Sequence, residues 1–209
     1  MNVPADQSLS TIIKERHSVR KFDTTYKIPT EEIKNILNEA IQAPSSSNLQ
    51  PWRFMVIEDQ EIKKELRQIA NNQECVETSS AVIAVLGDTE MYKNADKIYG
   101  MNVEAGFMDE GTRARIVENT MNTYPHASKE ARESIASFDA GLVSMQLMLI
   151  AKSKGYDTVT MGGYNKQQFI ERFDVPERYV PIVLIALGKA AVPSFQTTRL
   201  ALDEVAKFM

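Results

Sequence analysis

The chain has 209 residues, of which 43% are hydrophobic and 25% are charged, and its formal net charge is −4. A chain of this length buries enough apolar surface to fold without disulfide or metal crosslinks, and its 8% aromatic content is too high for a disordered tail. Lysine and arginine are dispersed among acidic residues, which argues against a nucleic-acid partner because no basic block could follow a phosphate backbone.

The chain contains a single cysteine, Cys75, so it can form neither an intrachain disulfide nor a multi-cysteine zinc site. A reducing cytoplasm is therefore the expected compartment. The segment Met1–Ser10 lacks the basic start and apolar core of a secretory leader, and no stretch approaches the roughly 20 apolar residues that span a bilayer. We expect a soluble, unprocessed cytoplasmic protein that binds no membrane.

The first clear element is a helix over residues 28–43. Thr30 is expected to cap it, and glutamates at the next two positions suit the positive end of the helix dipole. Its apolar residues recur at helical spacing and are Ile33, Ile36, Leu37, Ala40 and Ile41. Pro44 ends the helix and opens a polar loop whose short side chains favour turns.

Downstream, a strand is expected over residues 52–58, a surface helix over 59–73, and two strands over 81–86 and 181–187. These last two are continuous apolar runs that end at Gly87 and Gly188, which is typical of strands buried on both faces. The alternation of strands and helices predicts an α+β domain whose sheet is covered on both faces.

Two further regions lie between these strands. Residues 128–154 form an expected helix that is apolar nearly all round in its second half, before Gly155, so we expect it in the interior with Met145 and Met148 filling the core. Residues 88–125 follow no clean period, which is typical of a flexible or variable element.

Several familiar motifs are missing from the sequence. It has no dinucleotide-binding glycine fingerprint, phosphate-binding P-loop, zinc-protease helix motif, nucleophile elbow or C-x-x-C pair. With only His17 and His126, a multi-histidine metal site is nearly excluded, and we expect His126 to be a loop residue. Cys75 is expected to be an inert buried thiol rather than a nucleophile, because no neighbour in the sequence is basic enough to lower its pKa.

Three short motifs remain as candidate sites, and each has a plainer interpretation. RHSVR at residues 16–20 places two guanidiniums around a hydroxyl, which can hold a phosphate or a polyol but also suits a solvated turn. PSSSNLQPW at residues 44–52 offers hydroxyls and an amide to a polar ligand, or is simply a connection. MGGYN at residues 161–165 lets backbone N–H groups approach a flat ligand or an anion, or is a bare turn in which Asn165 caps the next helix.

In this order and at these separations, the three motifs resemble those of the FMN-dependent nitroreductases. The apolar helix that ends at residues 151–156, the strand over 180–188 and the late pair Arg199-Leu200 extend the resemblance to residues 8–200, except for 88–125. The resemblance implies an α+β nitroreductase-like fold, with a central, mostly antiparallel sheet flanked by helices, in an interlocked homodimer. It also implies that residues 1–209 form a single FMN-binding domain, with two FMN molecules at the dimer interface.

The same resemblance implies a role for each residue of the motifs. Arg16 and Arg199 would hold the FMN phosphate, Ser18 would contact the ribityl chain, and Arg20 with Asn48 would reach the pyrimidine edge of the ring. His17 would contribute through its backbone. The partner subunit would line the flavin with its serine loop, and the glycine turn would present N–H groups near the reactive nitrogen of the ring; these positions are Pro44, Ser45, Ser46, Ser47, Gly162 and Gly163. None of these residues is a catalytic acid or base.

Two departures from the family pattern affect these roles. Many relatives have a basic residue two positions before the terminal arginine, where this chain has Thr197, so the phosphate grip would be weaker or supplied by Lys189 or Lys21. Many relatives also have an acidic residue before the second glycine, where this chain has Gly162. The aromatic residues that could cover the flavin face or simply pack are Tyr92, Tyr99, Phe107 and Tyr124.

The function implied by the resemblance is a transfer of a hydride from NADH or NADPH, through FMN, to nitroaromatics, quinones or similar small conjugated acceptors. Because both substrates would use the same open face of the flavin, we expect ping-pong kinetics. One alternative is a non-catalytic module that binds and stores flavin. A second, a hydrolase that uses Ser18 and His17, is disfavoured because adjacent residues rarely orient as nucleophile and base and no orienting carboxylate can be assigned.

Overall fold

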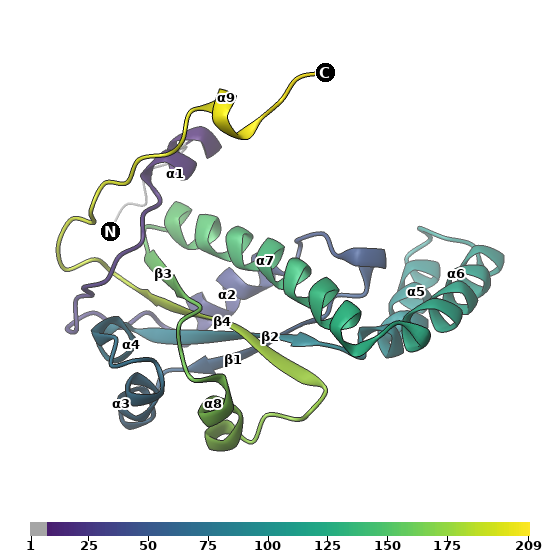
Figure 1. Ribbon diagram of the computed structural model, residues 1–209, viewed down its shortest axis with the longest axis horizontal. Coiled ribbons are helices and arrows are strands. Elements are labelled where there is room, and N and C mark those ends of the chain that lie inside the picture. The colour runs from purple at the N-terminus through teal and green to yellow at the C-terminus, as the bar shows by residue number, and fades with distance from the viewer. Residues whose placement is uncertain (1–7) are drawn as a thin grey trace.

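The computed structural model describes residues 8–209, so the first part of the Met1–Ser10 segment lies outside the described residues. Its centre is a four-stranded sheet in the order β1-β2-β4-β3, and every neighbouring pair is antiparallel (Figure 1). The strands are β1 (Trp52–Ile57), β2 (Ala81–Asp88), β3 (Asp157–Met161) and β4 (Tyr179–Gly188). The predicted α+β class with a mostly antiparallel sheet is confirmed.

Helices cover both faces of the sheet, as predicted. Alternate residues of β2 point to opposite faces, so that Ile83 packs with α2 and α7 while Val82 packs with α3, α4 and α8. The helices of the described chain are α1 (Leu9–Glu15), α2 (Thr30–Ala40), α3 (Gln60–Ile69), α4 (Glu74–Thr78), α5 (Ala95–Glu104), α6 (Glu110–Thr123), α7 (Lys129–Ser153), α8 (Lys166–Phe173) and α9 (Leu202–Val205). Single 3-10 turns occur at Ser46–Asn48, Met91–Asn94 and Tyr124–His126.

Helix α2 is shorter than the predicted helix over residues 28–43. Its N-cap residue is Pro29, and the Thr30 hydroxyl donates to Glu58 Oε1 at 3.0 Å, so the prediction that Thr30 caps the helix is wrong. Because the helix ends at Ala40, Ile41 turns away from the core and is 39% exposed. The predicted apolar face is otherwise present, with Ile33 and Ile36 fully buried.

Helix α7 begins and ends as the sequence predicts. The Ser128 hydroxyl accepts from the N–H of Ala131, and Gly155 follows the helix with a φ of +78°, which favours glycine. In the single chain, however, Phe138 is 65% exposed and Met145 is 38% exposed, so the placement of Met145 in the core is wrong. The outer face of α7 is therefore an apolar surface of the molecule.

Helix α7 also passes a simple test for a membrane span. It has 25 residues, and the mean hydropathy of its most apolar 18-residue window is 1.5. By length and composition, the expectation that no segment approaches a membrane span is therefore wrong. The core helix of a soluble protein passes the same test, and the inner face of α7 packs on the sheet through Val143 and Leu147.

The segment over residues 88–125, which follows no clean period, forms two helices rather than an irregular element. Helices α5 and α6 pack against each other and project from one end of the sheet (Figure 1). The inner side buries Tyr99, whereas Met101 is 57% and Phe107 83% exposed. Apolar residues thus occur on several faces of the hairpin, which is why the sequence shows no single period there.

Candidate functional site

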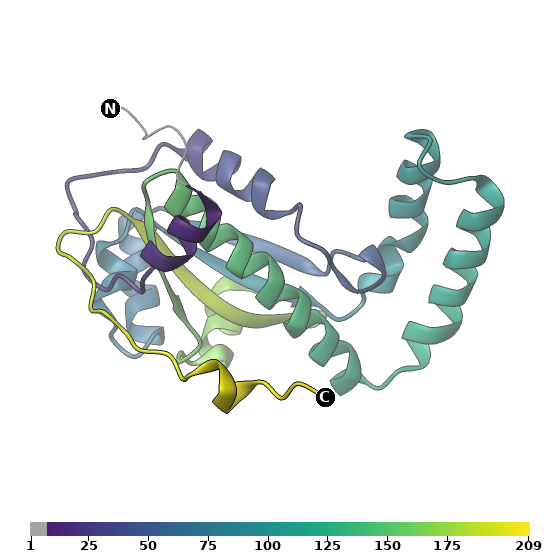
Figure 2. The same ribbon diagram turned by 90° about the horizontal axis from the view of Figure 1, so that it is seen from above.

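Segments from the two ends of the chain run side by side at the end of the sheet opposite the α5–α6 hairpin (Figures 1 and 2). The N–H of Asp23 donates to the carbonyl of Lys189 at 2.9 Å, and the N–H of Ala191 donates to the carbonyl of Lys21 at 2.9 Å. Further along, the N–H of Val19 donates to the carbonyl of Thr158 at 3.0 Å, so the N-terminal segment is also fixed to β3. These bonds bring the RHSVR motif next to the segment that carries Arg199.

A small cavity of about 80 Å³ lies between these segments and collects three arginines. Its lining residues are Arg16, His17, Ser18, Arg20, Phe195, Thr197 and Arg199. Among the described residues 8–209, no carboxylate lines it, so three guanidiniums converge there without an anion. Phosphate matches such a set, because guanidiniums donate paired, charge-assisted hydrogen bonds to its oxygens.

Two details of this cavity support an anionic ligand. The Nε of Arg16 is buried and has no hydrogen-bond partner in the structure, which is an unfavourable state for a cationic group unless a ligand accepts from it. Arg199 is oriented by its neighbours, since its NH1 donates to Thr197 Oγ1 at 2.8 Å and to the carbonyl of Thr198 at 2.7 Å. The residues present therefore fit the phosphate end of FMN.

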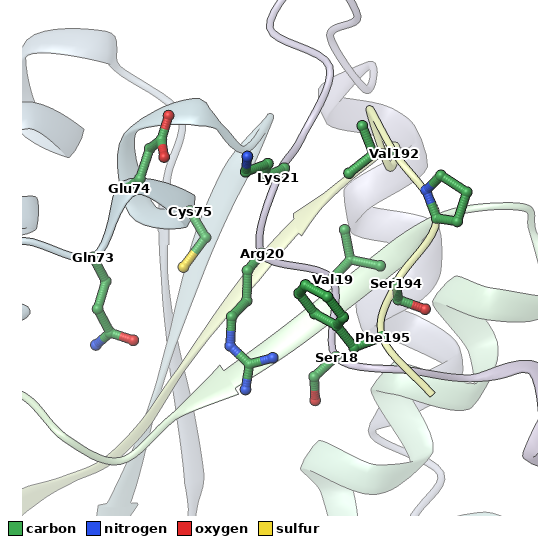
Figure 3. Close-up of a pocket in the computed structure, with 11 residues that line it drawn as sticks. Ser18, Val19, Arg20, Lys21, Gln73, Glu74, Cys75, Val192, Ser194 and Phe195 are labelled. Atoms are coloured by element: carbon green, nitrogen blue, oxygen red, sulfur yellow. The ribbon is translucent and has the colours of Figure 1, made fainter. Parts of the chain in front are cut away.

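A larger cavity of about 410 Å³ shares Ser18, Arg20 and Phe195 with the first. It lies between residues 18–21, 73–75 and 192–195, and Figure 3 shows the Arg20 side chain between the Gln73–Cys75 segment and Ser18. Its volume lies within the range of small-molecule pockets, and its walls combine apolar side chains with a few polar groups. The arrangement suits a flat heteroaromatic ring with one polar edge toward Arg20.

Cys75 lines the larger cavity but is not poised to react. Its side chain is 4% exposed, and Sγ lies 3.4 Å from Met161 Sδ. Burial raises the pKa of the thiol, which keeps it protonated at neutral pH. The prediction of an inert buried thiol is confirmed.

The glycine turn is joined to the larger cavity through Gln73, but neither Gly162 nor Gly163 lines that cavity, so the approach of the turn to the flavin stays a prediction. Gln73, which lines that cavity, donates from Nε2 to the carbonyl of Gly163 at 3.2 Å, and Asn71 Nδ2 donates to the same oxygen at 2.8 Å. A Cβ added at Gly162 would meet no atom within 4 Å, and one at Gly163 would meet only Asn71 Nδ2 at 3.8 Å. The turn thus faces open space that a side chain would occupy and that a ring could use instead. As predicted, Asn165 caps α8, its Oδ1 accepting from the N–H of Gln168.

The serine loop lies elsewhere in the single chain. Neither cavity is lined by Pro44, Ser45, Ser46, Ser47 or Asn48. Asp139, fully buried on α7, accepts from the N–H of Ser46 at 3.0 Å and from its hydroxyl at 3.0 Å. Burial raises the pKa of Asp139, and these bonds oppose the rise. One chain therefore does not bring Asn48 to Arg20, and the contribution of this loop from a partner subunit stays a prediction.

The backbone of this loop is strained and closely held. Ser47, Asn48 and Gln50 have φ values of 49°, 51° and 49°, in the left-handed region that costs a non-glycine residue about 1–3 kcal/mol. The hydroxyl of Tyr99 donates to the carbonyl of Ser47 at 2.5 Å, and the hydroxyls of Tyr124 and Ser47 are 3.0 Å apart. In the single chain, Tyr99 and Tyr124 therefore support the loop by hydrogen bonds to Ser47.

Three further predictions concern the cations and the hydrolase alternative. Lys189 does not line the small cavity, and its Nζ lies 4.7 Å from the centre of the Tyr26 ring, whereas Lys21 lines the larger cavity and not the small one. His126 lies in a 3-10 turn rather than in an open loop. Within residues 8–209, no hydrogen bond joins the Ser18 hydroxyl to His17, and no carboxylate lines the cavity that both residues share. That geometry does not suit a hydrolase.

Sequence reasoning missed Asn71 and Gln73. A weak signal existed, since two asparagines after a helix favour left-handed backbone, and Asn71 and Asn72 have φ values of 54° and 56°. However, which carbonyl the Asn71 and Gln73 side chains reach depends on how this loop folds. Among the described residues 8–209, no group of three or more His, Cys, Asp or Glu side chains could hold a metal ion.

The chain is similar to known proteins over most of its length. A family model described as "Nitroreductase family" matches residues 13–189. YodC of Bacillus subtilis (strain 168), provisionally named an NAD(P)H nitroreductase, is 40% identical over 198 residues, covering 95% of this chain and 97% of its own. The CLA biosynthesis enone reductase of Lactiplantibacillus plantarum is 32% identical over 197 residues, covering 93% of this chain and 91% of its own. A crystal structure from Exiguobacterium sibiricum 255-15, provisionally described as a nitroreductase in complex with FMN, superposes with a TM-score of 0.93 at 43% identity and covers 98% of both chains.

Proposed function

Since the chain belongs to the nitroreductase family, we propose that it transfers a hydride from NADH or NADPH, through FMN, to nitroaromatics, quinones or similar small conjugated acceptors. It is an oxidoreductase that uses FMN and NAD(P)H.

The observation that carries the proposal is the cavity in which Arg16, Arg20 and Arg199 converge with no carboxylate from the part of the chain that the structure describes. Arg16 and Arg199 would hold the FMN phosphate, with Thr197 orienting Arg199. Ser18 would contact the ribityl chain, and His17 would contribute through its backbone. Because Arg20 also lines the larger cavity, its charge would lie at the pyrimidine edge and stabilise negative charge on the ring.

Bound FMN supplies the hydride chemistry, so the chain itself needs no acid or base. The residues of the chain would hold FMN by its phosphate and by the polar edge of its ring. The open side of the Gly162–Gly163 turn would present backbone N–H groups near the reactive nitrogen of the ring. Both substrates would then use one free face in turn, which predicts ping-pong kinetics.

The acceptor class is supported by the names of the relatives. One is an enone reductase and others are named nitroreductases, and the substrates in these names are electron-poor conjugated molecules.

We further propose that residues 1–209 form one FMN-binding domain that works as a homodimer in the cytoplasm. The loop of Pro44, Ser45, Ser46, Ser47 and Asn48 would reach the flavin of the partner subunit, where Asn48 would join Arg20 at the pyrimidine edge. The strained backbone of this loop supports a binding role, because such strain concentrates at functional sites. A lone buried cysteine supports a reducing compartment.

An anaerobic titration tests the function and its main alternative together. Purified protein loaded with FMN should lose its flavin absorbance when NADH or NADPH is added and regain it when a quinone or a nitroarene follows. A module that only stores flavin would bind FMN but keep its absorbance with both nicotinamides. Protein that takes up no FMN would contradict both.

A further inference from the structure

The carbonyl of Gly163 receives two hydrogen bonds from side chains that the assigned function does not use. Asn71 Nδ2 donates at 2.8 Å and Gln73 Nε2 at 3.2 Å, both from the loop between α3 and α4. A carbonyl oxygen has two lone pairs, so these two donors fill its capacity. A double contact from one loop to one glycine is more than a turn between a strand and a helix requires.

The turn around Gly163 passes this polarisation on to its neighbour. The N–H of Tyr164 donates to the carbonyl of Gly162 at 3.3 Å, which closes a three-residue turn centred on Gly163. The carbonyl of Gly163 and the N–H of Tyr164 belong to one peptide group, and the carbonyl of Gly162 and the N–H of Gly163 belong to the next. Successive hydrogen bonds of this kind polarise one another, so donation to the Gly163 carbonyl strengthens the Gly163 N–H as a donor.

The N–H at the end of this series is available to a ligand. Among residues 8–209, no acceptor takes a hydrogen bond from the N–H of Gly163, and the residue is exposed. The neighbouring Gly162 faces open space, since an added Cβ would meet no atom within 4 Å. Gln73 also lines the larger cavity, so the series begins beside the proposed flavin ring, whereas Gly162 and Gly163 do not line that cavity in the single chain.

Contacts on either side of the glycines hold the turn in place. The N–H of Asn165 donates to the carbonyl of Ile69 at 2.9 Å, which fixes the turn to the end of α3. Tyr164 is 8% exposed and packs edge-on against Phe169 at a ring distance of 5.7 Å, so the turn is anchored in the core directly after the glycines. The turn can therefore shift little in response to a ligand.

We infer that Asn71 and Gln73 are positioning residues that hold and polarise the Gly162–Gly163 turn, so that the Gly163 N–H donates to the reactive nitrogen of the flavin. This inference rests on the proposed function, because it requires FMN in the larger cavity. A donor at that nitrogen favours the oxidised cofactor, whose nitrogen has a free lone pair, over the reduced cofactor, whose nitrogen carries its own hydrogen. The two side chains would thus lower the reduction potential of bound FMN without contacting the reacting atoms.

The test uses the variants Gln73→Met and Asn71→Gly, singly and together, in the FMN-loaded protein. Methionine keeps the length of Gln73 without a donor, and glycine keeps the left-handed backbone of Asn71, whose φ is 54°. The control is Gln167→Met, the same change at a side chain that bonds only within α8, to Glu171. The readouts are the dissociation constants of oxidised and reduced FMN and the reduction potential of the bound cofactor.

We expect the double variant to bind oxidised FMN about tenfold more weakly and to bind reduced FMN as before, which raises the two-electron potential by about 30 mV. Each single variant should give part of this shift, and Gln167→Met none. An equal loss of affinity in both oxidation states, or no change in either, would overturn the inference. If the double variant does not fold, the single variants decide in the same way. Wild-type protein that binds no FMN would instead contradict the proposed function.

Discussion

At the scale of single residues, the proposed phosphate site depends on two arginines from opposite ends of the chain. Arg16 follows α1 and Arg199 follows the last strand, and both reach one cavity of about 80 Å³. Thr197 stands where many relatives have a basic residue, and its hydroxyl accepts a hydrogen bond from Arg199. Thr197 thus brings no positive charge to the cavity, but it fixes the orientation of the Arg199 guanidinium.

Replacing either Arg16 or Arg199 by alanine should therefore weaken FMN binding. A hydrogen bond to a charged group contributes roughly 1.5–3 kcal/mol, so we expect the dissociation constant to rise about 10- to 150-fold in a flavin fluorescence titration. Thr197→Ala should have a smaller effect, because Arg199 keeps its bond to the Thr198 carbonyl. Arg172→Ala, which removes a surface ion pair with Glu65, is the control. Unchanged affinity in the first two variants would place the phosphate elsewhere.

A second residue, Lys63 on α3, makes the stability of the fold depend on pH. Its side chain is fully buried and donates to the carbonyls of Ser79 and Ser80. Burial, with the nearby charge of Lys27, lowers the pKa of Lys63 from 10.5 to about 8. Between these two pH values the unfolded chain binds more protons than the folded one, so Lys63 makes the fold more stable as the pH rises through this window.

Lys63→Met removes this titration while keeping an apolar stem of similar length. The free energy of unfolding of the wild type, measured with urea relative to that of the variant, should therefore increase between pH 7.5 and pH 9.5. The comparison cancels the titration of all other groups. A difference that stays constant over this range would show that Lys63 titrates normally in the fold.

At the scale of elements, α7 and the sheet approach so closely that one glycine is required. A Cβ at Gly87, near the end of β2, would lie 2.9 Å from Ala136 Cβ on α7, and Ala136 is fully buried. Gly87→Ala should destabilise the protein by about 1–3 kcal/mol, as overpacking of a tight core does. Gly100→Ala on α5, where the nearest atom would be 3.8 Å away, should be neutral or stabilising by up to about 1 kcal/mol. Equal thermal stability in the two variants would contradict this packing.

The elements that the sequence predicts well are those with a strong local signal. The apolar runs of β2 and β4 and the apolar helix before Gly155 have the form expected of a buried sheet and its central helix, and all three are present. The prediction that Thr30 caps α2 was wrong because the Thr30 hydroxyl donates instead to Glu58, which is distant in the sequence. The α5–α6 hairpin was not predicted, since its apolar residues serve more than one surface.

Part of the candidate site is likewise predictable from the sequence, and part is not. The arginines and the glycine turn are recognisable as motifs, and the cavities bring Arg16, Arg20 and Arg199 together. Asn71 and Gln73 could not be predicted, because their bonds to Gly163 depend on how the α3–α4 loop lies against a turn far along the chain.

At the scale of the whole molecule, the described chain exposes large apolar side chains on several of its elements. The C-terminal segment runs along the outside of the body, with α9 away from the sheet (Figure 2). Exposed apolar residues occur on it, on α1 and on the outer face of α7, and include Leu9, Ile13, Phe138, Phe195, Leu200, Leu202, Val205 and Phe208. Such an extended apolar surface supports the proposed second copy of the chain.

Two variants test the homodimer. Phe138→Asp should give a monomer in size-exclusion chromatography with light scattering, because Phe138 is 65% exposed and a carboxylate there would be buried without a partner in the dimer. Truncation after Ala190 should also impair assembly, since it removes the apolar C-terminal arm. Circular dichroism would show that each variant still folds. Wild-type protein that is monomeric at micromolar concentration would contradict the homodimer.

The central claim is that the two ends of the chain build one phosphate site for a flavin. Comparing the binding of FMN and riboflavin to the wild-type protein tests it most directly, because the two ligands differ only in the phosphate. We predict that FMN binds at least about tenfold more tightly, as one or more charge-assisted hydrogen bonds require. Equal dissociation constants for the two flavins would contradict the account.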